Sequence, residues 1–259
     1  MLPVLHIARA LAQRILPERR PGLSAYFRDQ VAERVAMAHR QLAYHTKTTR
    51  LLDVGCGRDL HASLVAAVCH RKRVIGYDVA PHLDLQVVDF TLRHLGHPGG
   101  VANLDDLRAL GIDYVVAPTI PEYLAFDGVM STAVIEHLPP PVIDRHLTLF
   151  NRHLPAGSVI SAVIDYRDHW SYISQLPPTA FYGHDTLTWW LLNSSRMYQN
   201  RLRHGQVRSR FDGAGFALVD EQLTTMPVHL ERSRLAPCFR ACSDADLGIG
   251  GALVAWRKP

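Results

Sequence analysis

The chain has 259 residues, of which 47% are hydrophobic and 20% charged, and its formal net charge is +4. This length suits one α/β domain with an added cap or lid rather than two independent domains, and the hydrophobic fraction excludes a disordered chain. No run of residues approaches the ~18 apolar positions that a membrane-spanning helix requires, so no membrane partner is expected.

Residues 1–48 predict two helices ahead of the first strand. Apolar residues recur at helical spacing near the N-terminus, and the pattern breaks at Pro17 and again at Pro21-Gly22. We expect residues 1–48 to form an N-terminal helical cap folded over a ligand site, and residues 49–259 to form the main domain.

The segment Leu51-Leu52-Asp53-Val54-Gly55-Cys56-Gly57 is the most informative part of the chain. Its apolar run predicts a buried strand that enters a tight turn, where glycine adopts positive φ and lets a ligand approach the backbone. Residues 58–68 then predict a helix with Asp59 as its N-cap. Strand, glycine turn and helix N-terminus together predict a nucleotide-binding crevice.

Three features select the nucleotide. Leu60 stands where the dinucleotide fingerprint G-x-G-x-x-G has its third glycine, and no phosphate-binding G-x-x-x-x-G-K-[ST] run follows Gly55. Asp53 would repel a pyrophosphate but suits an ammonium or sulfonium group. Asp78 ends the second predicted strand about 20 residues beyond the glycines, where a carboxylate binds ribose hydroxyls. A cationic, ribose-bearing ligand without phosphates fits all three, and S-adenosylmethionine is such a ligand.

The rest of the chain alternates predicted strands and helices, which is typical of a parallel sheet with helices on both faces. Strands are expected at 50–55, 73–78, 112–117, 126–131 and 157–164, followed by a closing hairpin of 214–222 and 249–256. Residues 165–204, rich in aromatic side chains, come between the fifth strand and this hairpin. Loops beyond the carboxyl ends of parallel strands line ligand crevices, so we expect residues 165–204 to be a helical lid that shapes a substrate pocket.

Several of these segments together resemble a known enzyme family. The segments LLDVGCG (51–57), VIGYDVAP (74–81) and FDGVMSTAVIEHLPP (126–140), and more weakly 147–165 and 211–220, match its motifs in order and spacing. Over residues 48–165 and 205–257 the chain resembles the class I S-adenosylmethionine-dependent methyltransferases. The resemblance implies a doubly wound α/β fold with a mostly parallel seven-stranded sheet and an antiparallel last strand. It also implies methyltransferase activity with S-adenosylmethionine as the cofactor.

The resemblance further implies a set of cofactor-binding residues: Asp53, Gly55, Cys56 and Gly57 in the first motif, Asp78 and Val79 in the second, and Ser131 and Thr132 in the third. The first motif would hold the methionine end and the second the ribose, while Ser131 and Thr132 would flank the transferred methyl group. Many relatives end the third strand with an acid that binds adenine, but here the strand ends Val115-Val116-Ala117-Pro118. We therefore expect backbone and apolar groups to hold adenine, with Asp89 as a possible substitute.

Candidates for a catalytic base follow the fourth and fifth strands. A base is needed only where the acceptor atom must lose a proton, as a hydroxyl group must. His137 is the first choice because an imidazole titrates near neutrality, with Glu136 beside it and His169 in the lid as the second choice. Asp165 and Asp168 also follow the fifth strand. A packing role for His137 and a surface position for His169 are the alternatives.

We expect a small-molecule methyltransferase of secondary metabolism, with oxygen as the favoured acceptor atom and a natural product or glycan as the acceptor. The stretches 165–170 and 198–203 are similar to methyltransferases of bacterial glycan and secondary-metabolite gene sets. One alternative is methylation of RNA or protein, which the basic cluster between Arg201 and Arg210 permits. That cluster is more simply a solvated helix face, so nucleic acid is not expected as a partner. A non-catalytic scaffold is the other alternative, which the complete cofactor motifs disfavour.

The four cysteines, Cys56, Cys69, Cys238 and Cys242, lack the spacing of a disulfide framework or of a zinc site. We therefore expect reduced thiols, a cytoplasmic protein and no bound metal. The identity of the acceptor and the oligomeric state stay open, with a homodimer as one possibility.

Overall fold

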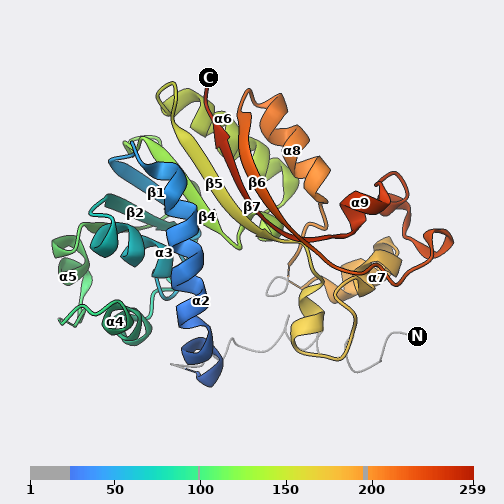
Figure 1. Ribbon diagram of the computed structural model, residues 1–259, viewed down its shortest axis with the longest axis horizontal. Helices are drawn as coiled ribbons and strands as arrows, with labels where there is room; N and C mark the ends of the chain where they lie inside the picture. Colours follow the sequence, from blue (N-terminus) through green and yellow to red (C-terminus); the bar gives the residue numbers. More distant parts are fainter. Residues whose placement is uncertain (1–23, 99, 195–197) are drawn as a thin grey trace.

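Seven strands form one sheet in the order β3-β2-β1-β4-β5-β7-β6 in the computed structural model, which describes residues 24–98, 100–194 and 198–259 (Figure 1). The strands are β1 (Arg50–Val54), β2 (Arg73–Asp78), β3 (Ile112–Val116), β4 (Gly128–Thr132), β5 (Val159–Asp165), β6 (Ala217–Thr225) and β7 (Ile249–Arg257). The first five are parallel, and β7 is antiparallel to both β5 and β6. The predicted seven-stranded sheet is confirmed, although β6 begins at Ala217 rather than at residue 214.

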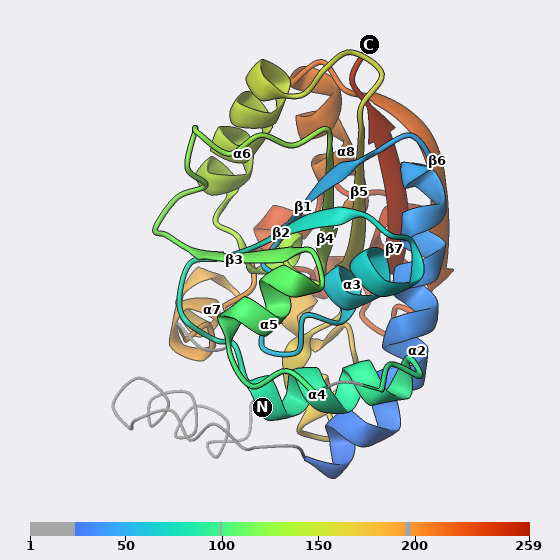
Figure 2. The same ribbon diagram turned by 90° about the vertical axis from the view of Figure 1, so that its left-hand side faces the viewer.

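Helices cover both faces of the sheet, as the views in Figures 1 and 2 show. The helices on the sheet are α2 (Ala25–Leu42), α3 (His61–Leu64), α4 (Leu85–His94), α5 (Leu104–Ala109), α6 (Pro140–His153) and α8 (His204–Gly213). Two further helices, α7 (Thr186–Leu192) and α9 (Asp244–Leu247), lie beyond the end of the sheet. Alternate residues of a strand point to opposite faces: Leu51 packs with α2 to α5, whereas Leu52 packs with α6 and α8. The sheet is therefore doubly wound, as predicted.

The helix α2 packs on the same face of the sheet as α3, α4 and α5. Ser24 caps its N-terminus by accepting a hydrogen bond from the Phe27 N–H. Near its C-terminus the fully buried Gln41 donates from Nε2 to the carbonyls of Ser131 and Ser161, each at 3.1 Å. These bonds tie α2 to β4 and β5. The first of the two helices expected in residues 1–48 lies outside the described residues.

The segment after β5 contains short helices, as expected. Its hydrophobic core also includes residues from another part of the chain. The 3₁₀ helices η4 (His169–Tyr172) and η5 (Ala180–Gly183) precede α7. Phe181 and Trp189 from this part pack against Leu235 and Phe239, which lie in the long connection 226–248 between β6 and β7. The segment that the sequence predicts as a lid therefore packs against a second segment, residues 226–248, which was not expected. The two are called the lid segments below.

The connection from β3 to β4 is short. Residues 117–127, all of them described, cross the sheet without a helix, and Ile120, Leu124 and Phe126 from this connection are buried. They belong to the same core cluster as Ile75 and Tyr77 of β2, in a connection between parallel strands where a crossover helix is usual. Among the described residues, no helix has both the length and the apolar character needed to cross a bilayer.

Candidate functional site

The turn after β1 has the backbone that the glycines predicted. Gly55 and Gly57 have φ values of +67° and +68°, in the left-handed region. A Cβ on Gly55 would lie only 2.5 Å from Cγ2 of Val134, in the loop after β4. The turn is held to the neighbouring strand because the N–H groups of Gly55 and Cys56 both donate to the Tyr77 carbonyl. The glycine turn and the loop after β4 are thus packed against each other.

Asp53 lies beneath the glycine turn and is only 2% exposed. Its carboxylate accepts a hydrogen bond of 2.6 Å from the Ser63 hydroxyl of α3. Burial, more than any other influence, raises the pKa of Asp53 to about 6. Asp53 therefore links β1 to α3 inside the protein.

Asp59 does not cap the helix, and that prediction is wrong. Leu60 occupies the N-cap position with a left-handed backbone (φ +50°), so α3 begins at His61. The Asp59 carboxylate instead binds Arg34 of α2 at 2.8 Å and lies 3.1 Å from Nδ1 of His61. It serves as an anchor between α2 and the start of α3.

Asp78 faces the same turn from the end of β2. One carboxylate oxygen accepts from the Gly57 N–H at 3.3 Å, and the other from the Val79 N–H at 2.7 Å. The Val79 side chain is 59% exposed. Asp89, the expected substitute for an adenine-binding acid, lies on α4 and pairs with Arg93 at 2.6 Å.

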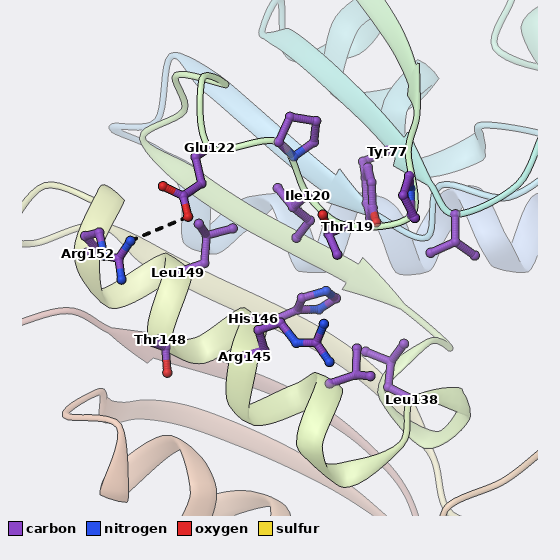
Figure 3. A pocket seen from close by; sticks show the side chains of 14 residues that line it. Tyr77, Thr119, Ile120, Glu122, Leu138, Arg145, His146, Thr148, Leu149 and Arg152 are labelled. Carbon is purple, nitrogen blue, oxygen red and sulfur yellow. Dashed lines mark ion pairs between the residues drawn. The ribbon is translucent and has the colours of Figure 1, made fainter.

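A cavity of about 390 Å³ opens beside Val79 (Figure 3). Its walls are the end of β2, the connection 117–127 and one side of α6, with Ile120, Leu138 and Leu149 as apolar lining. An ion pair between Glu122 and Arg152, 3.5 Å long, joins the connection to α6. The cavity lies where no crossover helix fills the space, and it adds an apolar surface to the end of β2.

At the end of β4, Ser131 and Thr132 are hydrogen-bonded to Gln41 of α2. Thr132 donates from Oγ1 to the Gln41 side-chain oxygen at 2.9 Å. The Ser131 hydroxyl is buried and has no hydrogen-bond partner among the described residues. Gln41 therefore positions the strand end, a role that the sequence pattern of an amphipathic helix did not reveal.

The structure brings the three catalytic candidates together. Glu136 and His137 lie in the 3₁₀ turn η3 (Ile135–His137) after β4, and His169 begins η4 after β5. The side chains of these three residues, here called the Glu–His–His cluster, place one ligand-type atom each within 4.8 Å of one another. The two imidazole rings lie 4.8 Å apart, centroid to centroid.

Neighbouring groups bind and bury the side chains of His137 and Glu136. Nδ1 of His137 lies 2.6 Å from the Tyr198 carbonyl, and burial lowers the pKa of this histidine. Glu136 is 4% exposed, and its Oε1 accepts from the Asp165 N–H at 3.2 Å. Burial raises the pKa of Glu136 to about 8. Burial therefore disfavours the charged form of both His137 and Glu136.

Asp165 lies beside the imidazole of His169. Its Oδ2 lies 3.6 Å from Nε2 of His169, and it also accepts hydrogen bonds from Arg167 and from the Tyr172 hydroxyl. Burial alone would raise the pKa of Asp165, but these partners outweigh it and hold the pKa below its usual range. Asp168, by contrast, points into the lid, where it is fully buried and accepts from the Trp170 N–H.

Residues 198–200 clamp the cluster, which the sequence did not indicate. Asn200 donates its N–H to the Glu136 carbonyl and its side chain to the carbonyls of Ile135 and Leu138. Gln199 accepts from the His169 N–H at 3.0 Å. The clamp fixes both turns that carry the cluster.

The basic cluster is not a solvated helix face, so that expectation is wrong. Arg203 is fully buried and donates to the carbonyls of Tyr166 and Ile249. Arg201 lies 4.7 Å from the Trp189 ring centroid. Arg208 and Arg210 pair with acids on neighbouring elements. The four arginines hold the lid and α8 in place.

Comparison with known proteins agrees with this architecture. Residues 23–221 match the model of a methyltransferase domain family, and no curated protein matches the sequence significantly. Solved structures with the fold include a putative O-methyltransferase from Nostoc punctiforme (15% identity, TM-score 0.51) and the S-adenosylmethionine-dependent methyltransferase SibL (16%, 0.52). A third is phosphoethanolamine N-methyltransferase 2 from Haemonchus contortus in complex with S-adenosylmethionine (16%, 0.50).

These structural likenesses cover 88%, 100% and 85% of this chain, respectively, but 56%, 70% and 52% of the other chains. The chain thus spans little more than half the length of two of these proteins. At such identities they show a shared fold only. The family model, however, covers most of the chain, including the glycine turn, Asp78 and the Glu–His–His cluster. The chain belongs to the class I S-adenosylmethionine-dependent methyltransferases.

Proposed function

We propose that the chain transfers a methyl group from S-adenosylmethionine to a hydroxyl group of a small molecule. The observation that carries this proposal is the Glu–His–His cluster with Asp165 at the carboxyl ends of β4 and β5. The loop that bears the cluster also packs on Gly55 through Val134. Cofactor turn and titratable groups are therefore neighbours in the fold.

The residues present fit the cofactor. The exposed Val79 and the apolar cavity beside it support a place for adenine, which needs no acid at the end of β3. We assign the cofactor site to Asp53, Gly55, Cys56, Gly57, Asp78, Val79, Ser131 and Thr132. When bound, S-adenosylmethionine supplies a methyl group on a positively charged sulfur that a nucleophile displaces in line. The backbone of the glycine turn and the Asp78 carboxylate hold and orient the ligand.

The titratable groups favour an oxygen acceptor. A neutral amine attacks without first losing a proton, whereas a hydroxyl group gains much of its reactivity by deprotonation. Four titratable side chains at the strand ends are more than an amine acceptor requires. We propose that the cluster binds the acceptor hydroxyl and promotes release of its proton, with Asp165 orienting His169.

The lid segments favour a small acceptor over RNA or protein. The segment after β5 carries His169 of the cluster, and the buried Arg203 joins it to β7 through the carbonyls of Tyr166 and Ile249. The arginines that suggested nucleic acid are already engaged within the protein. A natural product or glycan with free hydroxyl groups suits such a site.

Calorimetry with S-adenosylmethionine and its demethylated product tests the cofactor half, with Asp78→Asn as the variant that should weaken both. A screen of hydroxyl- and amine-bearing small molecules with labelled methyl groups tests the acceptor half. Label found only on nitrogen, or only on RNA or protein, would refute the proposed acceptor. Absence of cofactor binding by folded protein would favour a non-catalytic scaffold.

A further inference from the structure

The Glu–His–His cluster also has the composition of a metal centre. One carboxylate and two imidazoles, from two turns at neighbouring strand ends, offer their ligand atoms within 4.8 Å of one another. Two histidines with one carboxylate are a donor set that binds divalent transition metals and leaves positions open for other ligands. The spacing of the cysteines predicted no metal, but this cluster contains no cysteine.

His137 is oriented as a metal ligand would be. Its Nδ1 lies 2.6 Å from the Tyr198 carbonyl, which accepts hydrogen bonds and cannot donate one. The ring proton is therefore on Nδ1, and the lone pair is on Nε2. Metal-binding histidines are commonly fixed in this way, with the second ring nitrogen donating to a carbonyl or a carboxylate.

The other two donors have no hydrogen-bond partner at the atom in question. Oε2 of Glu136 is buried and unpartnered among the described residues, while Oε1 is held by the Asp165 N–H. Nε2 of His169 is likewise buried and without a hydrogen bond, 3.6 Å from Asp165. A buried carboxylate oxygen without a partner is costly unless something binds it. No lysine or arginine among the described residues pairs with Glu136.

We propose that Glu136, His137 and His169 bind one divalent transition-metal ion that in turn binds the acceptor hydroxyl. The donor set favours zinc, manganese, iron or cobalt over magnesium or calcium, which prefer oxygen ligands. Ligands about 2.0 Å from a tetrahedral ion lie about 3.3 Å apart. The longest separation in the cluster must therefore shorten by roughly 1.5 Å, which rotation of side chains can supply.

This proposal rests on the proposed function for its role and deepens it. A hydroxyl bound to a dication breaks its O–H bond more readily: the electron pair stays on oxygen and the proton passes to solvent. In this arrangement the two histidines act as ligands. Asp165, whose Oδ2 lies 3.6 Å from the same Nε2 of His169, borders the metal site and adds a negative charge beside it. The acceptor class narrows to molecules whose hydroxyl group can reach a metal, including vicinal diols.

Titration with Co²⁺, followed by its visible absorption, tests the site in the full chain. The exposed pair His39 and His70, whose ring nitrogens lie 2.9 Å apart, could bind metal adventitiously. All samples therefore carry His39→Gln and His70→Gln. We expect one cobalt ion per chain in this background. In Glu136→Gln and His169→Gln we expect the affinity for cobalt to fall by more than the roughly 10–100-fold that is typical when a residue hydrogen-bonded to a metal ligand is replaced. His94→Gln, which removes an exposed histidine of α4, should leave binding unchanged.

Absence of a cobalt spectrum, or a spectrum that survives both Glu136→Gln and His169→Gln, would overturn the proposal. Calorimetry with S-adenosylmethionine on the same metal-free samples reports the cofactor site separately and also shows that each variant is folded. Cofactor binding without cobalt binding refutes the metal centre alone. Cobalt binding that is lost in both variants, with no methyl transfer to any hydroxyl, refutes the proposed acceptor and leaves the metal centre standing.

Discussion

The buried carboxyl group of Asp53 should make the stability of the protein depend on pH in a direction that Asp53→Asn abolishes. Its pKa is raised to about 6, chiefly by burial, from a value of 3.8 for the exposed group. An acid with a raised pKa in the folded state costs nothing well below pH 3.8. It destabilises the fold progressively as the pH rises from about 3.8 to 6, because the unfolded chain loses a proton that the folded chain still holds, and the cost is constant at higher pH.

The magnitude follows from the size of the shift. About two pKa units at 1.36 kcal/mol each give a cost of roughly 3 kcal/mol above pH 7. About 0.5 kcal/mol of this is already present at pH 4. Asparagine keeps an acceptor for the Ser63 hydroxyl but has no charge. The stability of Asp53→Asn relative to the natural chain should therefore rise by about 2–3 kcal/mol between pH 4 and pH 8.

Urea unfolding of the ligand-free proteins at several pH values measures this difference. Asp59→Asn is the matched control, because Asp59 is equally buried but His61 and Arg34 lower its pKa despite burial. Because a lowered pKa changes the stability mainly below about pH 4, the stability of Asp59→Asn relative to the natural chain should stay nearly constant between pH 4 and pH 8. A difference between Asp53→Asn and the natural chain that stays flat across this range would refute the reasoning.

Three further predictions concern the turn, the cofactor and the lid. Asp78→Asn should weaken S-adenosylmethionine binding at least about tenfold by calorimetry, since a charged hydrogen bond contributes roughly 1.5–3 kcal/mol. Gly55→Ala places a Cβ 2.5 Å from Val134 at positive φ; thermal unfolding should show a loss of about 1–3 kcal/mol, and adding Val134→Ala should restore part of it. Arg203→Met leaves buried carbonyls without donors, so it should destabilise the chain by about 2–4 kcal/mol in urea.

The cofactor half of the site could be predicted because its geometry is local. The glycine turn, β2 and Asp78 lie within 28 consecutive residues, from Leu51 to Asp78, and their backbone follows from residue type. The predicted strands agree with the observed ones for the same reason. Asp59 is the local exception, since a left-handed leucine after a glycine turn has no signature in the sequence.

The second lid segment could have been suspected from loop length. Hairpin connections usually contain two to five residues, whereas the connection between β6 and β7 runs from Met226 to Gly248. Its partners, Phe181 and Trp189, lie far away in sequence, so only the folded structure identifies them. The burial of Arg203 was not predicted for the same reason, because its carbonyl partners lie in two distant segments, at Tyr166 and at Asp246 to Ile249.

The acceptor half of the site is built from long-range contacts, which explains why sequence alone identified its residues but not their chemistry. The sequence indicated each of the three cluster residues separately as a candidate base. Glu136 lies close to His169 only because β4 and β5 are adjacent and parallel. Their clamp comes from residues 198–200, more than 60 positions beyond Glu136. Substitutions in the lid segments can therefore change which acceptor is bound without changing the glycine turn that binds the cofactor. The fold thus determines the methyl donor, whereas the acceptor is determined by side-chain contacts that vary independently of the fold.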